Sequence, residues 1–266
     1  EDEVKRLRAA SEDNSGVNAR TFLGDGSRQY LTGLNLGGRN VAILLDVSSS
    51  MLADRLVNII RLRNMDARLQ RQADKWSRAL NTVDWLTAQL PVASRYQVIT
   101  FNTLAEPALP DTAGKWLEVA NQAQLEQVSA RLRKIVPKGG TSLINAFTSL
   151  QAMSPPPDNI FLITDGLPTQ GTRIRGGVVS GQQRQALFNE AAQRLPRGVP
   201  VNVILMPMEG DPRAASGVVA VCIPSRKSPI FSGGIAVSTP VRNKMFKPVM
   251  TKAPSAPASV TVALPV

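Results

Sequence analysis

The chain has 266 residues, of which 43% are hydrophobic and 19% charged, so it can bury a globular core. It contains no histidine and a single cysteine, Cys222, which excludes Ser-His-Asp triads, Cys-His pairs, structural zinc sites and an intramolecular disulfide. The formal net charge is +11, a value that raises the question of nucleic-acid binding.

Most of the positive charge lies near the C-terminus. From Asp211 onward there are one acidic and seven basic residues, so this part contributes +6 and the first 210 residues contribute 11 − 6 = +5. Such a small excess is typical of ordinary basic surface, and we expect no nucleic-acid partner. No apolar run is long enough for a membrane span. Because the chain starts at Glu1 rather than at Met, an upstream signal or anchor, and with it a cell-envelope location, stays open.

Residues 1–39 are predicted to form a helical end followed by a linker. Val4 and Leu7 have heptad-like spacing, and the residues from Ser11 to Arg39 are rich in Gly, Asn, Asp and Ser.

Residues 40–210 alternate apolar runs with amphipathic stretches. Buried strands are predicted at 41–46, 95–102, 159–164 and 200–208, and a short edge strand at 104–109. Helices are predicted at 51–60, 76–90, 124–136, 143–153 and 181–195. This alternation predicts an α/β fold with a doubly wound, mostly parallel sheet, one short antiparallel edge strand and helices on both faces.

The charged stretch between the first two predicted helices is interpreted as a solvated face; its basic residues are Arg61, Arg63, Arg68, Arg71 and Lys75. Trp76 and Trp85, in the second helix, are expected to contribute to the core.

Residues 211–266 form an atypical basic, Pro-rich tail without a convincing helical period. Strands at Val218–Ile223 and Val260–Leu264 are the elements it could form. The rest of this tail has two interpretations: it is disordered, or its sequence results from a shift of the reading frame near Gly217.

Oxygen-bearing side chains follow three of the predicted elements. Asp46, Ser48 and Ser50 come directly after the first strand, Thr141 follows a Gly-Gly turn, and Asp165 follows the strand at 159–164. Parallel strands place their carboxyl ends at one edge of a sheet, where ligands bind, and the Gly-Gly pair permits close approach of the backbone. Oxygen ligands favour Mg²⁺, Mn²⁺ or Ca²⁺ over Zn²⁺.

Each of these motifs also has a purely structural interpretation. Ser48 and Ser50 could cap the helix predicted to start near Met51, and Asp165-Gly166 could be a simple turn. The occurrence of all three motifs together favours the metal site.

The three motifs occur in the order found in a known family: Asp-x-Ser-x-Ser at 46–50, Gly-Gly-Thr-Ser at 139–142 and Ile-Thr-Asp-Gly at 163–166. Over residues 40–208 the sequence resembles the von Willebrand factor type A (vWA) domain of bacterial type, with its metal-ion-dependent adhesion site (MIDAS). The resemblance implies a complete MIDAS whose side-chain ligands are Asp46, Ser48, Ser50, Thr141 and Asp165. It also implies Mg²⁺, with Mn²⁺ or Ca²⁺ as alternatives.

The function that the resemblance implies is metal-dependent protein binding, as an adhesion or scaffold module. An open coordination position of the ion would accept the carboxylate of an Asp or Glu on a partner protein. Arg173 and Arg175, just past Asp165, are candidates for partner selection.

Two other functions are weighed against this one. Chelatase-like members of the family work with an AAA-type ATPase, so a subunit of that kind is the first alternative. A Mg²⁺-dependent hydrolase is the second, but it needs a general base beside the metal. Without histidine only carboxylates such as Asp54 could serve, and we expect the protein not to be an enzyme.

Overall fold

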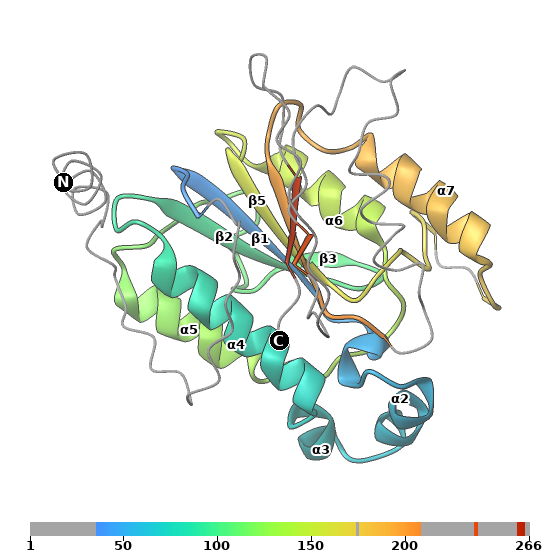
Figure 1. The fold of residues 1–266 in the computed structure, drawn as a ribbon. Coiled ribbons are helices and arrows are strands. Elements are labelled where there is room, and N and C mark those ends of the chain that lie inside the picture. Colours follow the sequence, from blue (N-terminus) through green and yellow to red (C-terminus); the bar gives the residue numbers. More distant parts are fainter. Residues whose placement is uncertain (1–35, 174–175, 209–236, 239–259, 264–266) are drawn as a thin grey trace, which may run out of the picture.

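The computed structural model describes residues 36–173, 176–208, 237–238 and 260–263. At its centre lies strand β1 (Asn40–Asp46), of which every residue is buried. A continuous apolar strand of this kind needs cover on both faces, and helices lie on both sides of the sheet in Figure 1.

The sheet formed by the described residues has eight strands in the order β3-β2-β1-β5-β6-β8-β7, with β4 pairing separately with β2. The strands after β1 are β2 (Arg95–Phe101), β3 (Ala105–Pro107), β4 (Leu117–Glu118), β5 (Asn159–Thr164), β6 (Val201–Leu205), β7 (Val237–Ser238) and β8 (Val260–Ala263). Pairing is parallel from β2 through β1, β5, β6 and β8 to β7. The predicted fold class is thus confirmed.

The antiparallel part of the sheet is larger than the sequence predicts. Besides β3, which forms the predicted edge, β4 also runs antiparallel to β2 and pairs near the other end of that strand.

Two layers of helices enclose the sheet, α4 and α5 on one face and α6 and α7 on the other (Figure 1). The helical elements are η1 (Ser49–Leu52), α2 (Leu56–Arg63), α3 (Ala67–Arg71), α4 (Asp74–Gln89), α5 (Gln122–Leu132), α6 (Leu143–Ser149), η2 (Leu150–Ala152) and α7 (Gly181–Ala192). Trp76 is fully buried and Trp85 partly buried on the α4 side of the core, as predicted.

The helix predicted at 51–60 is not continuous. A short 3-10 turn, η1, ends at Leu52, Ala53 is extended, and α2 starts only at Leu56. Its apolar residues therefore do not share one buried face: Ile59 is buried, whereas Leu56 and Ile60 are more than half exposed. The apolar residues of 51–60 do have helical spacing. The break at Ala53, however, turns most of the apolar residues of α2 away from the core.

Part of the C-terminal tail lies in the sheet. The strand predicted at Val260–Leu264 is present as β8, which pairs in parallel with β6. The strand predicted at Val218–Ile223 and most of the tail lie outside the described residues. Within the described parts of the chain, none of the helices combines the length and the apolar character that crossing a membrane requires.

Leu44 gives a direct test of this core, because it is fully buried in the central strand and lies opposite Ile99 and Leu162 of the neighbouring strands. Leu44→Ala is expected to lower the free energy of unfolding by about 2–5 kcal/mol, measured by urea denaturation. Val57→Ala, at a position that is 75% exposed on α2, should change it by less than about 0.5 kcal/mol. Equal effects of the two substitutions would contradict the arrangement of the core.

Candidate metal centre

The first loop of the site follows β1 and is held by the carboxylate of Asp46. Asp46 is fully buried, and its Oδ1 accepts a hydrogen bond of 2.9 Å from the backbone N–H of Ser48. The hydroxyls of Ser48 and Ser50 lie 2.9 Å apart and are hydrogen-bonded. Ser48 stands at the start of η1, but its side chain makes no capping hydrogen bond, so the capping interpretation has no support here.

The sequence analysis missed Thr164, the last residue of β5. Its hydroxyl donates a 2.8 Å hydrogen bond to Oδ2 of Asp46. This contact joins the ends of two adjacent parallel strands. The signal in the sequence was a polar residue that ends the apolar run Ile160–Ile163, directly before Asp165.

The Gly-Gly turn reaches the site by backbone contacts. The N–H of Ser49 donates to the carbonyl oxygen of Gly139 at 3.0 Å, and the turn is also bonded to the loop after β5, because Thr141 accepts from the N–H of Thr169 at 3.0 Å. A Cβ on Gly140 would lie 2.8 Å from the side chain of Gln170, so a larger residue would push these loops apart. Thr141 is 97% buried between them.

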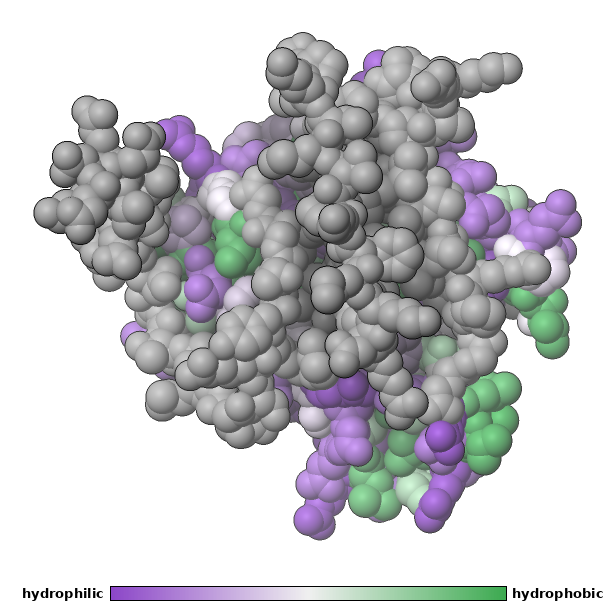
Figure 2. Space-filling view, viewed as in Figure 1, coloured by the Kyte–Doolittle hydropathy of each residue, from purple (hydrophilic) through white to green (hydrophobic). Residues whose placement is uncertain are grey.

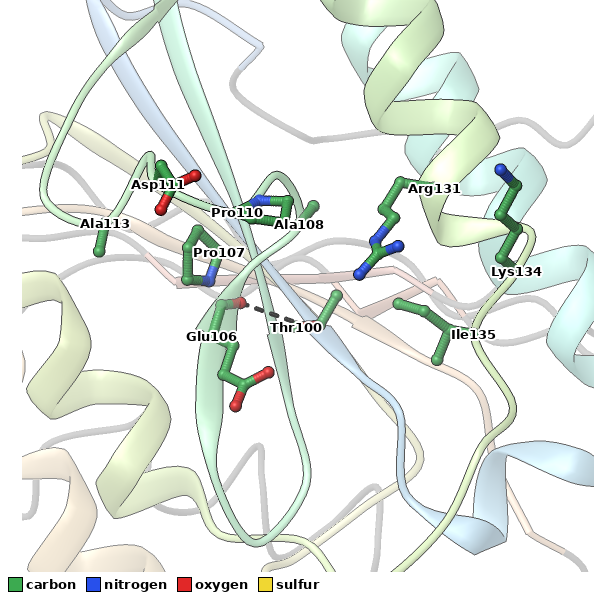
Figure 3. A pocket seen from close by; sticks show the side chains of 10 residues that line it. All are labelled: Thr100, Glu106, Pro107, Ala108, Pro110, Asp111, Ala113, Arg131, Lys134 and Ile135. Carbon is green, nitrogen blue, oxygen red and sulfur yellow. Dashed lines mark hydrogen bonds between the residues drawn. The ribbon is translucent and has the colours of Figure 1, made fainter.

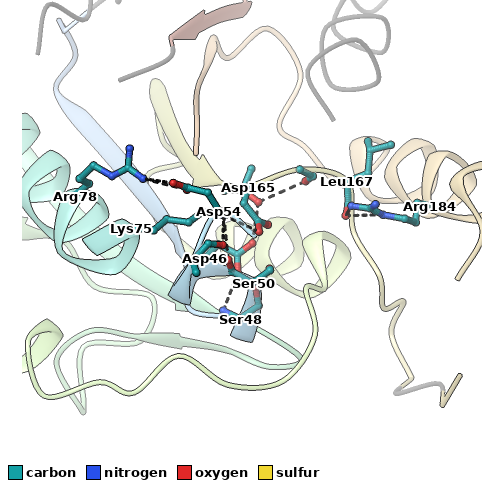
Figure 4. Close-up of polar contacts among 12 residues, drawn as sticks. Asp46, Ser48, Ser50, Asp54, Lys75, Arg78, Asp165, Leu167 and Arg184 are labelled. Carbon is teal, nitrogen blue, oxygen red and sulfur yellow. Dashed lines mark hydrogen bonds and ion pairs between the residues drawn. The ribbon is translucent and has the colours of Figure 1, made fainter. Parts of the chain in front are cut away.

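Asp165 has a partner that the sequence analysis placed elsewhere. Lys75, interpreted as part of a solvated face, is only 1% exposed, and its Nζ lies 3.3 Å from Oδ2 of Asp165 (Figure 4). The interpretation was wrong because Lys75 shares a buried face of α4 with Ala79 and Leu86. The helical spacing of these positions was the signal that the surrounding charges obscured.

Burial governs the ionisation of Asp46. Loss of hydration, together with the nearby negative charge of Asp165, raises the pKa of Asp46 from 3.8 to about 7. Its hydrogen bonds to Ser48 and Thr164 act in the opposite direction and are outweighed.

The residues present fit a hard divalent cation. The described hydrogen bonds to Asp46 come from neutral groups, so its buried charge is left to be balanced by another cation. No place in the described part of the chain gathers three or more His, Cys, Asp or Glu side chains. An ion here would therefore take ligands from hydroxyls and water as well as from two carboxylates, as Mg²⁺ readily does.

Two pockets, both formed by described residues, are not lined by the candidate ligands. A pocket of about 560 Å³ lies between β3 and the end of α5, and Figure 3 shows Glu106, Asp111, Arg131 and Lys134 at its wall. A second, of about 470 Å³, is lined by residues of η1, α2 and α4 and includes Lys75, which connects it to the site.

One comparison with known proteins gives a family match for part of the chain. Residues 41–167 match the sequence model of the von Willebrand factor type A domain, and all five candidate ligands lie inside the match. This part of the chain is therefore similar to the vWA domain family. A comparison with curated proteins gave no match.

Several solved structures resemble the chain at low identity. A von Willebrand factor type A protein from Catenulispora acidiphila is 16% identical (TM-score 0.45), and the match covers 63% of this chain but only 33% of that one. The protein BatB from Bacteroides thetaiotaomicron is 22% identical (TM-score 0.40), covering 65% of this chain and 73% of that one. Proximal thread matrix protein 1 of the mussel byssus, with a zinc-occupied MIDAS motif, is 16% identical (TM-score 0.36; 63% and 38% covered).

Two candidate residues for partner selection are not brought into the site by any described contact. Arg173 is exposed in the loop after Asp165, and Arg175 lies outside the described residues. Asp54, the candidate base of a hydrolase, has both oxygens within 3.0 Å of Nη2 of Arg78, so it is already paired.

The raised pKa of Asp46 predicts a pH effect on the stability of the metal-free protein. Between pH 3.8 and about 7 the folded state holds a proton that the unfolded state has lost, so stability falls as pH rises through this window. The slope is at most about 1.4 kcal/mol per pH unit, measured by urea unfolding in EDTA. In Asp46→Asn this contribution should disappear, so the difference in stability between the two proteins changes with pH. A constant difference would contradict the assignment.

Proposed function

We propose that this vWA domain is a metal-dependent protein-binding module. Its proposed ligands are Asp46, Ser48, Ser50, Thr141 and Asp165. They lie at and after the end of β1, after the Gly-Gly turn and after β5. The observation that carries the proposal is the pair of buried like charges, Asp46 and Asp165, beside serine hydroxyls at the carboxyl edge of the sheet. Buried carboxylates are stable as anions only when a cation or hydrogen bonds compensate them.

The chain's own residues orient this site before any ligand arrives. The amide of Ser48 and the hydroxyl of Thr164 fix both oxygens of Asp46, and each oxygen keeps a second lone pair. A bound Mg²⁺, or Mn²⁺ or Ca²⁺, would supply a positive centre that a partner's Asp or Glu carboxylate can share. Because several ligands are neutral hydroxyls, that centre would keep much of its charge.

A neighbouring apolar surface supports a protein as the partner. Leu56, Val57 and Ile60 on α2 are 53–75% exposed, and α2 packs beside η1, the element that follows the first loop of the site. Figure 2 shows hydrophobic residues exposed at the end of the molecule where α2 lies in Figure 1. Exposed apolar groups beside a polar site are typical of interaction surfaces.

Metal binding is the first test. Mn²⁺ is expected to raise the thermal unfolding temperature of the chain, because an ion that binds only the folded state stabilises it. Asp46→Ala should abolish this shift while circular dichroism shows the fold retained. Asp54→Asn, which removes a partly exposed carboxylate from the same region, is the matched control and should keep the shift. If Asp46→Ala keeps the shift, the assignment of Asp46 as a metal ligand is wrong.

Partner capture is the second test. A protein captured by the wild-type chain in Mg²⁺ should be lost in EDTA and with Asp46→Ala, and replacing one Asp or Glu of that protein should release it. Val57→Glu should weaken capture by about tenfold, a cost of about 1.4 kcal/mol, because it places a charge in the apolar contact. The same variant should keep the thermal shift with Mn²⁺. Metal-independent capture of the natural partner would rule the proposal out.

A further inference from the structure

The metal centre contains a cation of its own. Lys75 is the second residue of α4, and its side chain is 99% buried. Its ammonium group lies 3.0 Å from the carbonyl oxygen of Ser50, 3.4 Å from that of Ala53 and 3.3 Å from Oδ2 of Asp165. These hydrogen bonds join the segment after β1, at Ser50 and Ala53, to Asp165 after β5 (Figure 4).

This geometry is well suited to an ammonium group. Lysine has three N–H donors, and three oxygen acceptors surround it. A buried lysine is strongly disfavoured unless an opposite charge compensates it, and Asp165 supplies that charge at only 7% exposure. Lys75 and Asp165 therefore stabilise each other in the absence of a metal ion.

The same contact affects any cation that uses Asp165. A divalent ion at the site would share this carboxylate with Lys75 and would lie within a few ångströms of a second positive charge. Buried charges interact strongly over such distances, since little water screens them. The charge balance also changes: two carboxylates and a divalent ion sum to zero, and Lys75 leaves one positive charge in excess.

We propose that Lys75 is a built-in counter-cation that weakens metal binding and leaves the loaded site positive for a partner's carboxylate. This inference rests on the proposed function, because it concerns the same ion. Lys75 acts as a positioning residue. It shares Asp165 with the ion, and when the ion is absent it holds the segments after β1 and β5 together. In this proposal the site binds the metal ion less tightly, and the loaded site attracts an anionic group more strongly.

The experiment removes the charge of Lys75 and measures Mn²⁺ binding to the full chain by electron paramagnetic resonance of the free ion. Lys75→Met keeps most of the side-chain volume, and Lys75→Gln keeps a donor for the carbonyl oxygens of Ser50 and Ala53. Both variants are expected to bind Mn²⁺ about tenfold or more tightly than the wild type. Arg78→Met, one turn along the same helix at a half-exposed position, is the control and should change affinity less than about twofold.

A second readout separates this role from simple structural support. Without metal both Lys75 variants should unfold at a lower temperature than the wild type, because Asp165 loses its partner. Addition of Mn²⁺ should then raise their unfolding temperature by more than it raises that of the wild type. A residue that only supports the fold would lower stability and weaken metal binding together.

The possible outcomes distinguish the two proposals. Tighter Mn²⁺ binding by the variants supports the inference, and it does so even if the wild type binds no Mn²⁺, in which case the metal-dependent function fails alone. Mn²⁺ binding by the wild type with equal or weaker binding by both variants overturns the role of Lys75 and leaves the proposed function intact. If neither the wild type nor the variants bind Mn²⁺, both are overturned.

Discussion

Two carboxylates of the same charge are buried side by side at one edge of the sheet, and the local structure is arranged to tolerate them. Asp46 is fully buried and Asp165 nearly so, and the negative charge of Asp165 makes ionisation of Asp46 less favourable. Neutral donors hold Asp46, whereas the ammonium of Lys75 holds Asp165. A divalent cation would relieve the repulsion that remains, which gives a physical reason to expect one there.

The parallel sheet creates this situation. β1 and β5 are direct neighbours, and their register places Leu45 opposite Ile163, so the residues that end the two strands also meet. The hydrogen bond from Thr164 to Asp46 joins the ends of the two strands. The turn at Gly139 binds the loop after β1, because the carbonyl oxygen of Gly139 accepts from the N–H of Ser49. The site is therefore attached to two strands whose residues are all buried.

The sequence predicted the strands and the three motif loops well, because continuous apolar runs ending in polar residues have few other interpretations. It did not predict the break at Ala53, since local spacing cannot show which half of an apolar stretch the core accepts. Lys75 was misplaced for a related reason. Its charge suggested solvent, and only its position on the buried face of α4, set by tertiary packing, shows otherwise.

The ion pairs of the site bear on the hydrolase alternative. Asp54, the carboxylate that this alternative would use as a base, is paired with Arg78, and Asp165 is paired with Lys75. This edge of the sheet combines buried oxygen-bearing side chains, the buried positive charge of Lys75 and, on α2, apolar side chains that face solvent. An acidic residue on a partner protein, with apolar neighbours around it, would complement all three at once.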